Sequence, residues 1–231
     1  MNALRVTDLT VTRGAGPVIS EVGFTLEPGH ITALVGPNGA GKTSLLEAIS
    51  GVVPAASGTV HIGADDVTKQ SRVARARRGL AHIEQGRAVF GGLTVLENLM
   101  LTARTRARAD ELFDVFPELA KRRDSPAALL SGGEQQMVVL ARAFAARPAF
   151  LLIDEMSLGL APVVFTRLLP MVTRFAAEGA AILLVEQFTH LALGVARDAL
   201  VVSSGRVTYS GDAATLLDSP DTLHTAYLGG P

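Results

Sequence analysis

One stretch, Gly36–Thr43, constrains the fold of this chain more than any other. It reads Gly-Pro-Asn-Gly-Ala-Gly-Lys-Thr and fits the pattern G-x-x-x-x-G-K-[ST] of a phosphate-binding loop. The apolar run at residues 31–35 predicts a buried strand before it, and the apolar spacing of residues 44–49 predicts a helix after it. A glycine-rich turn with a chance lysine is the alternative, but such a turn does not require a strand before it and a helix after it. We therefore predict a nucleotide phosphate site here.

The chemistry of this loop follows from its residue types. Glycines let backbone N–H groups converge on phosphate oxygens, and the following helix points its positive N-terminal end at the same anions. Lys42 can reach the β- and γ-phosphates, while the Thr43 hydroxyl can bind Mg²⁺. A nucleotide with its metal ion is the expected ligand.

Composition bounds the class of protein. The 231 residues suffice for one large or two small domains, and 48% of them are hydrophobic, which is ample for a core. The net charge of −1 gives no sign of nucleic acid or anionic lipid as a partner. The absence of cysteine excludes disulfides and thiolate metal sites and fits the cytosol.

Membrane insertion is not expected from the sequence. The first residues lack the apolar segment of a signal peptide, and the longest apolar runs, such as residues 180–185, are too short to span a bilayer. We therefore expect a soluble chain that reaches a membrane only through partners.

Hydrophobic patterning predicts an α/β fold with a helical insertion. Further strands are expected at residues 4–11, 18–26, 59–62, 150–155 and 180–185, and residues 200–202 and 206–209 are expected to form a short hairpin around a turn at 203–205. A strand from residue 80 runs into a polar loop that holds Gln85. Residues 94–128 carry helical patterning, and Thr94 with Glu97 forms a capping box at their start. Helices are also expected from Pro162 and near residues 213–217, and the basic segment 72–78 is best interpreted as a solvated helix face.

A second sharp signal lies at residues 130–136, Leu-Ser-Gly-Gly-Glu-Gln-Gln. Ser131 and Glu134 form another capping box, so a helix begins here with an apolar stripe behind it. Glycines weaken a helix start, which makes sense if an anion approaches the backbone closely. An ordinary capped helix is the alternative, and this stretch alone does not decide between the two.

The predicted strand at residues 150–155 ends in two acids. Ligands of parallel sheets bind at the carboxyl ends of the strands, so Asp154 is placed to hold Mg²⁺ beside Thr43. Glu155 follows directly and can orient or deprotonate an attacking water. A polar strand end without function is the alternative, and the phosphate loop upstream argues against it.

Taken in order, these motifs resemble the nucleotide-binding subunit of an ABC transporter. The phosphate loop, the Gln85 loop, the helical insertion, the Ser-Gly-Gly-Glu-Gln signature and the apolar strand into two acids cover essentially the whole chain. The resemblance implies a phosphate-loop NTPase core with a mostly parallel sheet and an antiparallel β subdomain. It implies one domain over residues 1–231, with the core at 1–84 and 132–231 and a helical subdomain at about 85–131.

The resemblance narrows to the LivF-type subunit, one of two ATPases that drive import of branched-chain amino acids. It rests on residues 86–90, 93–95, 157–162, 184–187 and 226–230. Related importers carry urea, amides or other amino acids, so the solute is a weaker inference than the ATPase. The implied location is the inner face of the cell membrane, through two permease subunits and with an extracytoplasmic solute-binding protein.

The family also implies a head-to-tail dimer, with a sister subunit or with a second copy, that encloses ATP and Mg²⁺. Catalysis is expected from Glu155, Lys42 and Gln187, and the metal site from Thr43, Gln85 and Asp154. Contacts to ATP are expected from Arg13, Gly36, Pro37, Asn38, Gly39, Ala40, Gly41, Lys42, Thr43, Ser44 and Gln85. Contacts to the partner's ATP are expected from Leu130, Ser131, Gly132, Gly133, Glu134 and Gln135.

Several positions depart from the commonest pattern of this family. Arg13 stands where an aromatic ring usually stacks on adenine, although a guanidinium can stack too. Gln187 replaces a histidine that contacts the γ-phosphate, and it can donate a hydrogen bond but carry no proton. Met156 replaces a proline, and the loop after it lacks the usual aspartate. Phe90 and Leu93 are candidate contacts for a permease helix, with subdomain core as the alternative.

Two other classes of protein compete with this prediction. A soluble ABC ATPase that acts on nucleic acid or ribosomes usually has tandem cassettes or coiled-coil arms, whereas this chain has one motif set, no heptads and no basic excess. A nucleotide-gated regulatory module without catalysis is disfavoured by the intact Glu155 and signature.

Overall fold

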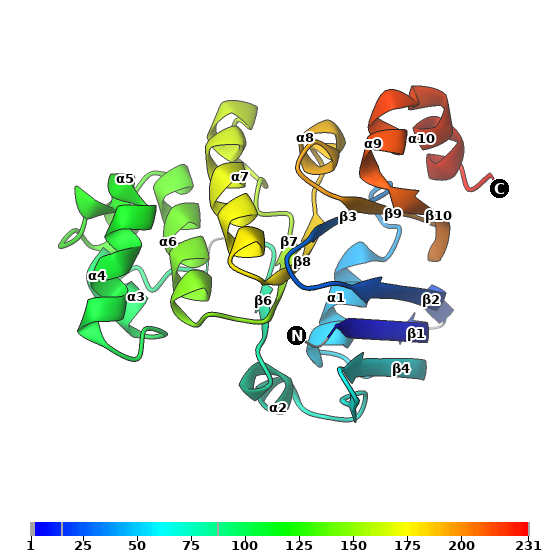
Figure 1. Ribbon diagram of the computed structural model, residues 1–231, viewed down its shortest axis with the longest axis horizontal. Helices are drawn as coiled ribbons and strands as arrows, with labels where there is room; N and C mark the ends of the chain where they lie inside the picture. The colour runs from blue at the N-terminus through cyan, green and yellow to red at the C-terminus, as the bar shows by residue number, and fades with distance from the viewer. Residues whose placement is uncertain (1–2, 15, 87, 231) are drawn as a thin grey trace.

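The computed structural model describes residues 3–14, 16–86 and 88–230, which form two β-sheets and a set of helices (Figure 1). Ala15, in the turn predicted after the first strand, and Arg87, in the motif after Gln85, lie outside these ranges. None of the helices in the described part of the chain has the length and hydropathy to span a bilayer.

The larger sheet has six strands in the order β10-β9-β3-β8-β7-β6. They are β3 (Ile31–Val35), β6 (Leu80–Ile83), β7 (Phe150–Asp154), β8 (Ala181–Val185), β9 (Asp198–Ser203) and β10 (Arg206–Asp212). Neighbouring strands pair in parallel except for β10, which runs antiparallel to β9. Every residue of β3, β7 and β8 is buried, as expected for a parallel sheet that is covered on both faces.

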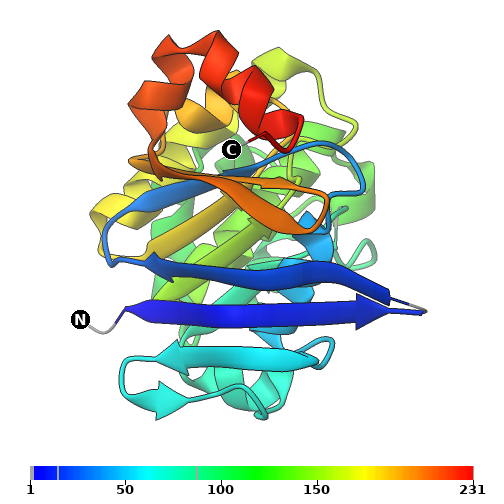
Figure 2. The same cartoon turned by 90° about the vertical axis from the view of Figure 1, so that its right-hand side faces the viewer.

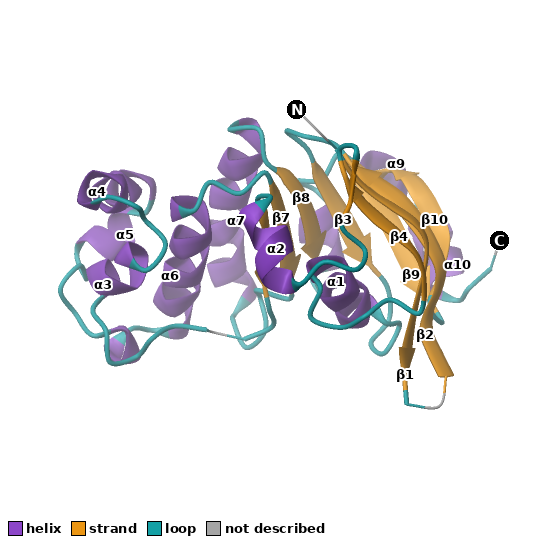
Figure 3. Cartoon of the chain, turned by 90° about the horizontal axis from the view of Figure 1, so that it is seen from below, coloured by secondary structure: helices purple, strands orange, loops and turns teal. Residues whose placement is uncertain are grey.

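The smaller sheet is antiparallel and has the order β2-β1-β4-β5 (Figure 2). Its strands are β1 (Leu4–Arg13), β2 (Gly16–Leu26), β4 (Ser57–Ile62) and β5 (Asp65–Asp66). Helix α1 (Lys42–Ser50) lies between the two sheets (Figure 3). Its Leu45, Leu46 and Ile49 share one apolar core with both sheets, so the predicted mostly parallel core with an antiparallel β subdomain is confirmed.

The remaining face of the larger sheet is covered by helices, whose outer members stand at one end of the molecule (Figure 1). They are α3 (Val95–Met100), α4 (Arg106–Val115), α5 (Pro117–Ala120), the 3₁₀ turn η1 (Ala127–Leu129), α6 (Gly132–Ala145) and α7 (Pro162–Ala177). The helical patterning over residues 94–128 is therefore confirmed. Helix α6 packs against α3, α4 and α5 as well as α7, and the subdomain boundary near residue 131 stays a prediction.

The C-terminal part adds α8 (Thr189–Leu193), α9 (Ala213–Asp218) and α10 (Pro220–Tyr227). The sequence predicted a tail rather than the last of these helices. The helix is short and buries only Ala226 fully, while Leu223 and Tyr227 are partly buried against the core, so its apolar pattern covers little more than one turn. Hydrogen bonds from the Thr208 hydroxyl to the Ala226 carbonyl (2.7 Å) and from the Ser203 hydroxyl to the Tyr227 carbonyl (2.8 Å) fix it to the sheet.

The basic segment forms α2 (Arg72–Arg77), and the prediction of a solvated face is wrong for one member. Arg75 is only 2% exposed. Its guanidinium donates to the carbonyl oxygens of Ala48 (2.7 Å), Ile49 (2.5 Å) and Thr68 (2.7 Å). Arg75 therefore adds donors at the C-terminal end of α1, where the Ala48 carbonyl also accepts from the Gly51 N–H (3.2 Å), and a charge pattern in the sequence does not reveal this role.

Candidate functional site

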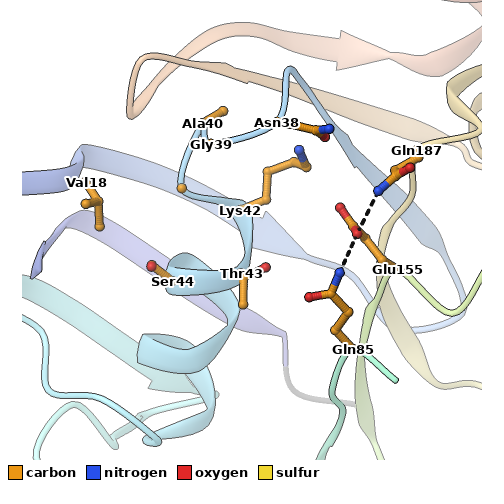
Figure 4. Close-up of a pocket in the computed structure, with 11 residues that line it drawn as sticks. Val18, Asn38, Gly39, Ala40, Lys42, Thr43, Ser44, Gln85, Glu155 and Gln187 are labelled. Carbon is orange, nitrogen blue, oxygen red and sulfur yellow. Dashed lines mark hydrogen bonds between the residues drawn. The ribbon is translucent and has the colours of Figure 1, made fainter. Parts of the chain in front are cut away.

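The predicted phosphate loop connects β3 to α1 and forms one wall of a cleft of about 390 Å³. Elements far apart in sequence converge on this cleft (Figure 4). Its lining comprises Val18, Asn38, Gly39, Ala40, Gly41, Lys42, Thr43, Ser44, Gln85, Glu155 and Gln187. Most of the predicted loop residues and three of the polar side chains expected around them are thus brought together.

Two glycines of the loop are required by the packing around them. Gly36 has φ 147°, and a Cβ atom there would lie 2.0 Å from the carbonyl oxygen of Val202. Gly41 has φ 98°, and a Cβ atom there would lie 2.4 Å from the carbonyl oxygen of Val18. No side chain can occupy these positions without displacing β9 or β2, so the loop backbone is fixed from both sides.

Lys42 begins α1 and is buried to 6% exposure. Its ammonium donates to the carbonyl oxygens of Gly36 (2.9 Å) and Pro37 (3.0 Å) and so lies across the loop. Burial lowers the pKa of Lys42, and the nearby charges of Glu155 and Asp154 oppose that shift. The positive charge is therefore held at the place where phosphate oxygens would meet the loop.

Asp154, at the C-terminal end of β7, is 1% exposed, and both of its carboxylate oxygens are buried without a hydrogen bond of acceptable geometry. Burial raises its pKa to about 6, while the Thr43 hydroxyl and the Lys42 charge act in the opposite direction. Unpaired buried carboxylate oxygens are costly in a folded protein. Their position beside Thr43 fits a divalent cation, for which carboxylate and hydroxyl oxygens are suitable ligands.

Glu155 follows Asp154 with φ 45°, in the left-handed region. Its Oε2 atom accepts hydrogen bonds from the side-chain amides of Gln85 (2.8 Å) and Gln187 (3.0 Å). Figure 4 shows these amides on either side of the carboxylate, which faces Lys42 across the cleft. Residues from the loop after β6 and the end of β8 thus orient one carboxylate, the arrangement expected for a group that positions or deprotonates water.

Arg13 does not line this cleft. It ends β1 and forms an ion pair with Glu47 on α1, and its side chain is 43% exposed. Val18, an apolar residue of β2 that the sequence analysis did not single out, lines the cleft instead. Stacking of Arg13 on adenine stays a prediction.

The signature stretch begins α6, outside the lining of this cleft. The predicted capping box is present, because the Ser131 hydroxyl accepts from the Glu134 N–H (3.3 Å) and the Glu134 carboxylate accepts from the Ser131 N–H (2.8 Å). The Gln135 amide donates to the Ala127 carbonyl (3.0 Å), and Leu130 is buried. These contacts fix the N-terminal end of α6 without using the phosphate loop of the same chain.

Gly133 of the signature has a reason within this chain as well. A Cβ atom there would lie 2.6 Å from the Val164 side chain on α7. The close approach of α6 and α7 therefore demands a small residue, in addition to the anion approach inferred from the sequence.

The two apolar residues predicted to contact a permease differ in exposure. Phe90 is 52% exposed, and the Arg142 guanidinium lies 5.0 Å from its ring centroid. Leu93 is half-buried. Phe90 thus offers apolar surface next to the Gln85 loop, while Leu93 belongs partly to the packing of the helical region.

Sequence analysis also did not connect Ser157 with Glu186. Both side chains are buried, and the Glu186 carboxylate accepts hydrogen bonds from the Ser157 N–H (3.2 Å) and hydroxyl. The signal that could have found the pair is the parallel register of β7 and β8, which places the residues after Asp154 beside those after Val185.

A buried lysine on a glycine loop, an unpaired aspartate beside Thr43 and an amide-held glutamate define a phosphate-loop nucleotide site. The profile of the family described as "ABC transporter" matches residues 19–157, which is more than half of the chain. The chain therefore belongs to the ABC transporter family, whose ATP-binding subunits are ATPases.

Curated relatives are similar along nearly their whole length. The high-affinity branched-chain amino acid transport ATP-binding protein BraG of Pseudomonas aeruginosa is 35% identical, over 92% of this chain and 93% of the relative. The lipopolysaccharide export system ATP-binding protein LptB of Escherichia coli (strain K12) is 34% identical, over 92% of this chain and 91% of the relative.

Solved structures have the same fold. A nucleotide-free ATP-binding cassette from an ABC transporter superimposes with a TM-score of 0.85 at 23% identity, covering 96% of this chain and 98% of the other. An ATP-binding subunit of an ABC transporter has a TM-score of 0.83 at 28% identity, covering 97% and 98%. The predicted ABC ATPase fold is thereby confirmed.

Proposed function

We propose that this ATPase subunit drives import of branched-chain amino acids across a cell membrane. The observation that carries the proposal is the end-to-end similarity to BraG, at 35% identity. The LivF-type motifs in the sequence, above all residues 184–187, support the same branch of the family. Importers of urea, amides or other amino acids remain alternatives within that branch.

In this proposal, a water molecule in the cleft attacks the γ-phosphate in line with the leaving group. The loop backbone and Lys42 bind and neutralise the β- and γ-phosphates. Glu155 orients the water or takes its proton, and the two amides from Gln85 and Gln187 hold its carboxylate in place. Gln187 donates a hydrogen bond but cannot relay a proton, so Glu155 is the general base in this scheme.

The residues present also fit a magnesium ion. Groups of three or more His, Cys, Asp or Glu side chains suited to a metal are absent from the described ranges. Thr43, Asp154 and Gln85 would hold it, and the unpaired oxygens of Asp154 support this assignment. When bound, Mg²⁺ neutralises charge that develops on the phosphates.

A second ATPase subunit, either a sister chain or a copy of this one, completes the site in this proposal. The signature of each subunit would place the positive N-terminal end of α6 against the γ-phosphate bound by the other. The fixed capping box of Ser131 and Glu134 supports this role, because it leaves the first turn of the helix preorganised.

The whole complex would place the subunit at the cytoplasmic face of the membrane. Two transmembrane permease subunits would bind beside the Gln85 loop, where the exposed Phe90 ring supports a contact. An extracytoplasmic solute-binding protein would deliver the amino acid. No nucleic acid takes part.

Export of lipopolysaccharide is the second candidate function. It is favoured by the 34% identity to LptB over almost the same length. The two candidates share the ATPase chemistry and differ only in the membrane partners and the transported molecule, so the nucleotide site does not separate them.

Reconstitution of the subunit with its permease partners and binding protein in lipid vesicles tests the proposal. We expect ATP-dependent uptake of labelled leucine, with uptake abolished by Lys42→Ala and by Glu155→Gln. An excess of unlabelled isoleucine or valine should reduce the uptake of labelled leucine, whereas an excess of urea should not. Vesicles that hydrolyse ATP but take up no leucine would reject the branched-chain solute and keep the ATPase. Extraction of lipopolysaccharide by the same complex would establish the second candidate.

A further inference from the structure

The ends of β7 and β8 carry a second side-chain contact that the proposed chemistry does not use. Directly after β8, Gln187 bonds to Glu155 and its neighbour Glu186 bonds to Ser157. The two contacts lie on either side of Met156, which is itself 2% exposed. Glu186 and Gln187, which follow β8, therefore hold Ser157 and Glu155, which flank the buried Met156 after β7.

The Glu186 contact is fully internal. Glu186 is 1% exposed and Ser157 is 4% exposed, and the carboxylate takes both the N–H (3.2 Å) and the hydroxyl of Ser157. A carboxyl group is expensive to bury unless its oxygens are satisfied. Its retention at this depth therefore points to a geometric task, namely fixing the backbone N–H of Ser157 in place.

The backbone at this point needs such a hold. Glu155 has the left-handed φ of 45°, which costs free energy in a residue other than glycine. One backbone hydrogen bond, from the Glu155 N–H to the Val185 carbonyl (3.0 Å), ties it to β8. The turn then continues through a hydrogen bond from the Leu158 N–H to the Glu155 carbonyl (3.1 Å). Without the Glu186 contact, the residues after Glu155 lose their side-chain anchor to β8.

We infer that Glu186 is a positioning residue for ATP hydrolysis, which holds Ser157 so that the turn keeps the Glu155 carboxylate aimed at the cleft. The inference rests on the proposed role of Glu155. Glu186 does not touch nucleotide in this scheme, and its effect passes through Ser157 and the left-handed backbone of Glu155. The hold requires hydrogen-bond geometry rather than charge, because the amide of a glutamine could accept from the Ser157 N–H and donate to its hydroxyl.

The test measures ATP affinity and turnover of the full chain in its assembled complex for three variants of this contact and for two reference variants. Glu186→Ala should lower kcat at least about tenfold, the loss typical of a misplaced catalytic group, while the dissociation constant for ATP changes less than about twofold. Glu186→Gln should keep kcat within about threefold of the original protein. Ser157→Ala should lower kcat by an intermediate factor, because the N–H contact remains.

Thr102→Ala is the matched control for stability. It removes a hydroxyl that donates to the Arg142 carbonyl (2.8 Å) on the helical side, away from the cleft lining. It should lower the melting temperature without changing kcat. Because a structural defect would lower the folded fraction, kcat is normalised to the amount of ATP bound at saturation.

Three results would overturn the inference or its basis. Full turnover of Glu186→Ala would refute the positioning role. Loss of turnover in Glu186→Gln equal to that in Glu186→Ala would show that the negative charge matters, which also contradicts it. Glu155→Gln is measured in parallel, and if that variant retains turnover, the proposed chemistry fails rather than the role of Glu186.

Discussion

At the scale of single residues, this protein orients the Glu155 carboxylate of the cleft with amides instead of charges. Gln85 and Gln187 donate to the same oxygen of Glu155, and they come from different strand ends. Each amide is a neutral donor, so neither adds charge to the cleft as a histidine cation would. The buried Lys42 supplies a positive charge that interacts with Glu155, and the loop carbonyls hold it in place.

Removing one of the two amide donors should lower turnover more than nucleotide affinity. Gln187→Leu preserves approximate size but leaves the Glu155 carboxylate with one donor. A hydrogen bond to a charged group contributes about 1.5–3 kcal/mol, so we expect kcat to fall roughly 10- to 100-fold. Steady-state kinetics and fluorescent nucleotide binding measure the two effects separately. An unchanged kcat would show that Gln85 alone suffices to orient the carboxylate.

The buried carboxyl of Glu186 should make stability depend on pH. Burial raises its pKa to about 7 from an ordinary value of 4.5, against the opposing hydrogen bonds from Ser157. Between these values the folded state binds more protons than the unfolded state, so this group makes the free energy of unfolding fall as pH rises from about 4.5 to 7. Glu186→Gln should therefore be more stable than the original protein above about pH 7, by up to about 3 kcal/mol.

Urea unfolding at two pH values measures this effect. The stability difference between Glu186→Gln and the original protein should be large at about pH 8 and vanish at about pH 4.5, since the carboxyl is then protonated in the folded state. An equal difference at both values would mean that ionisation of Glu186 is not its source.

At the scale of elements, two contacts fix helices against one another. Helix α6 approaches α7 so closely that Gly133 faces the Val164 side chain. Helix α1 ends on the guanidinium of Arg75, which comes from α2. Both contacts join elements whose packing places a motif, the signature in the first case and the phosphate loop in the second.

Gly133→Ala should destabilise the protein although alanine favours helices. The added methyl would lie 2.6 Å from Val164, and overpacking costs typically 1–3 kcal/mol, more than the roughly 0.5–1 kcal/mol gained in helix propensity. Thermal unfolding measures the change. Gly92→Ala is the control, because nothing lies within 4 Å of the added atom. Adding Val164→Ala to Gly133→Ala should restore stability, because it removes the side chain that the new methyl group meets. A stable single variant would mean that α6 and α7 separate easily.

Arg75→Met should lower the free energy of unfolding, because it removes hydrogen-bond donors from the C-terminal end of α1. The methionine fills similar space but provides no donors for the carbonyls of Ala48 and Ile49. The Ala48 carbonyl keeps its hydrogen bond from the Gly51 N–H (3.2 Å), whereas the Ile49 carbonyl loses its side-chain donor, at a cost of about 1–3 kcal/mol. We expect a lower free energy of unfolding and increased amide exchange in the last turn of α1. Arg77→Met, at an exposed position of the same helix, should change neither.

At the scale of the whole molecule, the phosphate loop and the signature helix of one chain lie on separate surfaces. The cleft around Lys42 draws on both sheets, whereas Ser131 lies at the end of the helical region. In the dimer we propose, the phosphate loop of each subunit faces the signature helix of the other. Exposed apolar side chains in the turn after Glu155 and on α7, Leu158 at 45% and Val163 at 62%, are consistent with such a contact.

The two surfaces can be separated experimentally by mutation. Glu155→Gln with ATP should sediment as a dimer, with a sister subunit or with itself, because trapped ATP joins the two chains. Adding Ser131→Arg should abolish that dimer while ATP still binds the monomer, since Ser131 would contact only the partner's nucleotide. Sedimentation velocity with labelled ATP reports both quantities. A dimer that persists with Ser131→Arg would place the interface elsewhere.

Local sequence determined a large part of this protein. The phosphate loop, the two capping boxes and the buried strand into Asp154 are short-range patterns, and each follows from backbone chemistry within a few residues. The resemblance carried by their order also predicted the fold class and the presence of Gln85 and Glu155 in one site, whereas the hydrogen bond between them was found only in the structure. Helix α10 was not predicted, because its apolar pattern covers little more than one turn and includes one fully buried residue.

Tertiary structure alone decided which distant residues meet. The sequence indicated that Arg75 is one cation of a solvated helix face, but packing buries it at the end of α1. Val18 of β2 lines the cleft because of the way the strands pack. The contact of Glu186 with Ser157 depends on the parallel register of β7 and β8. Such contacts join residues far apart in the chain, so their free energy depends on burial and geometry that no local pattern encodes.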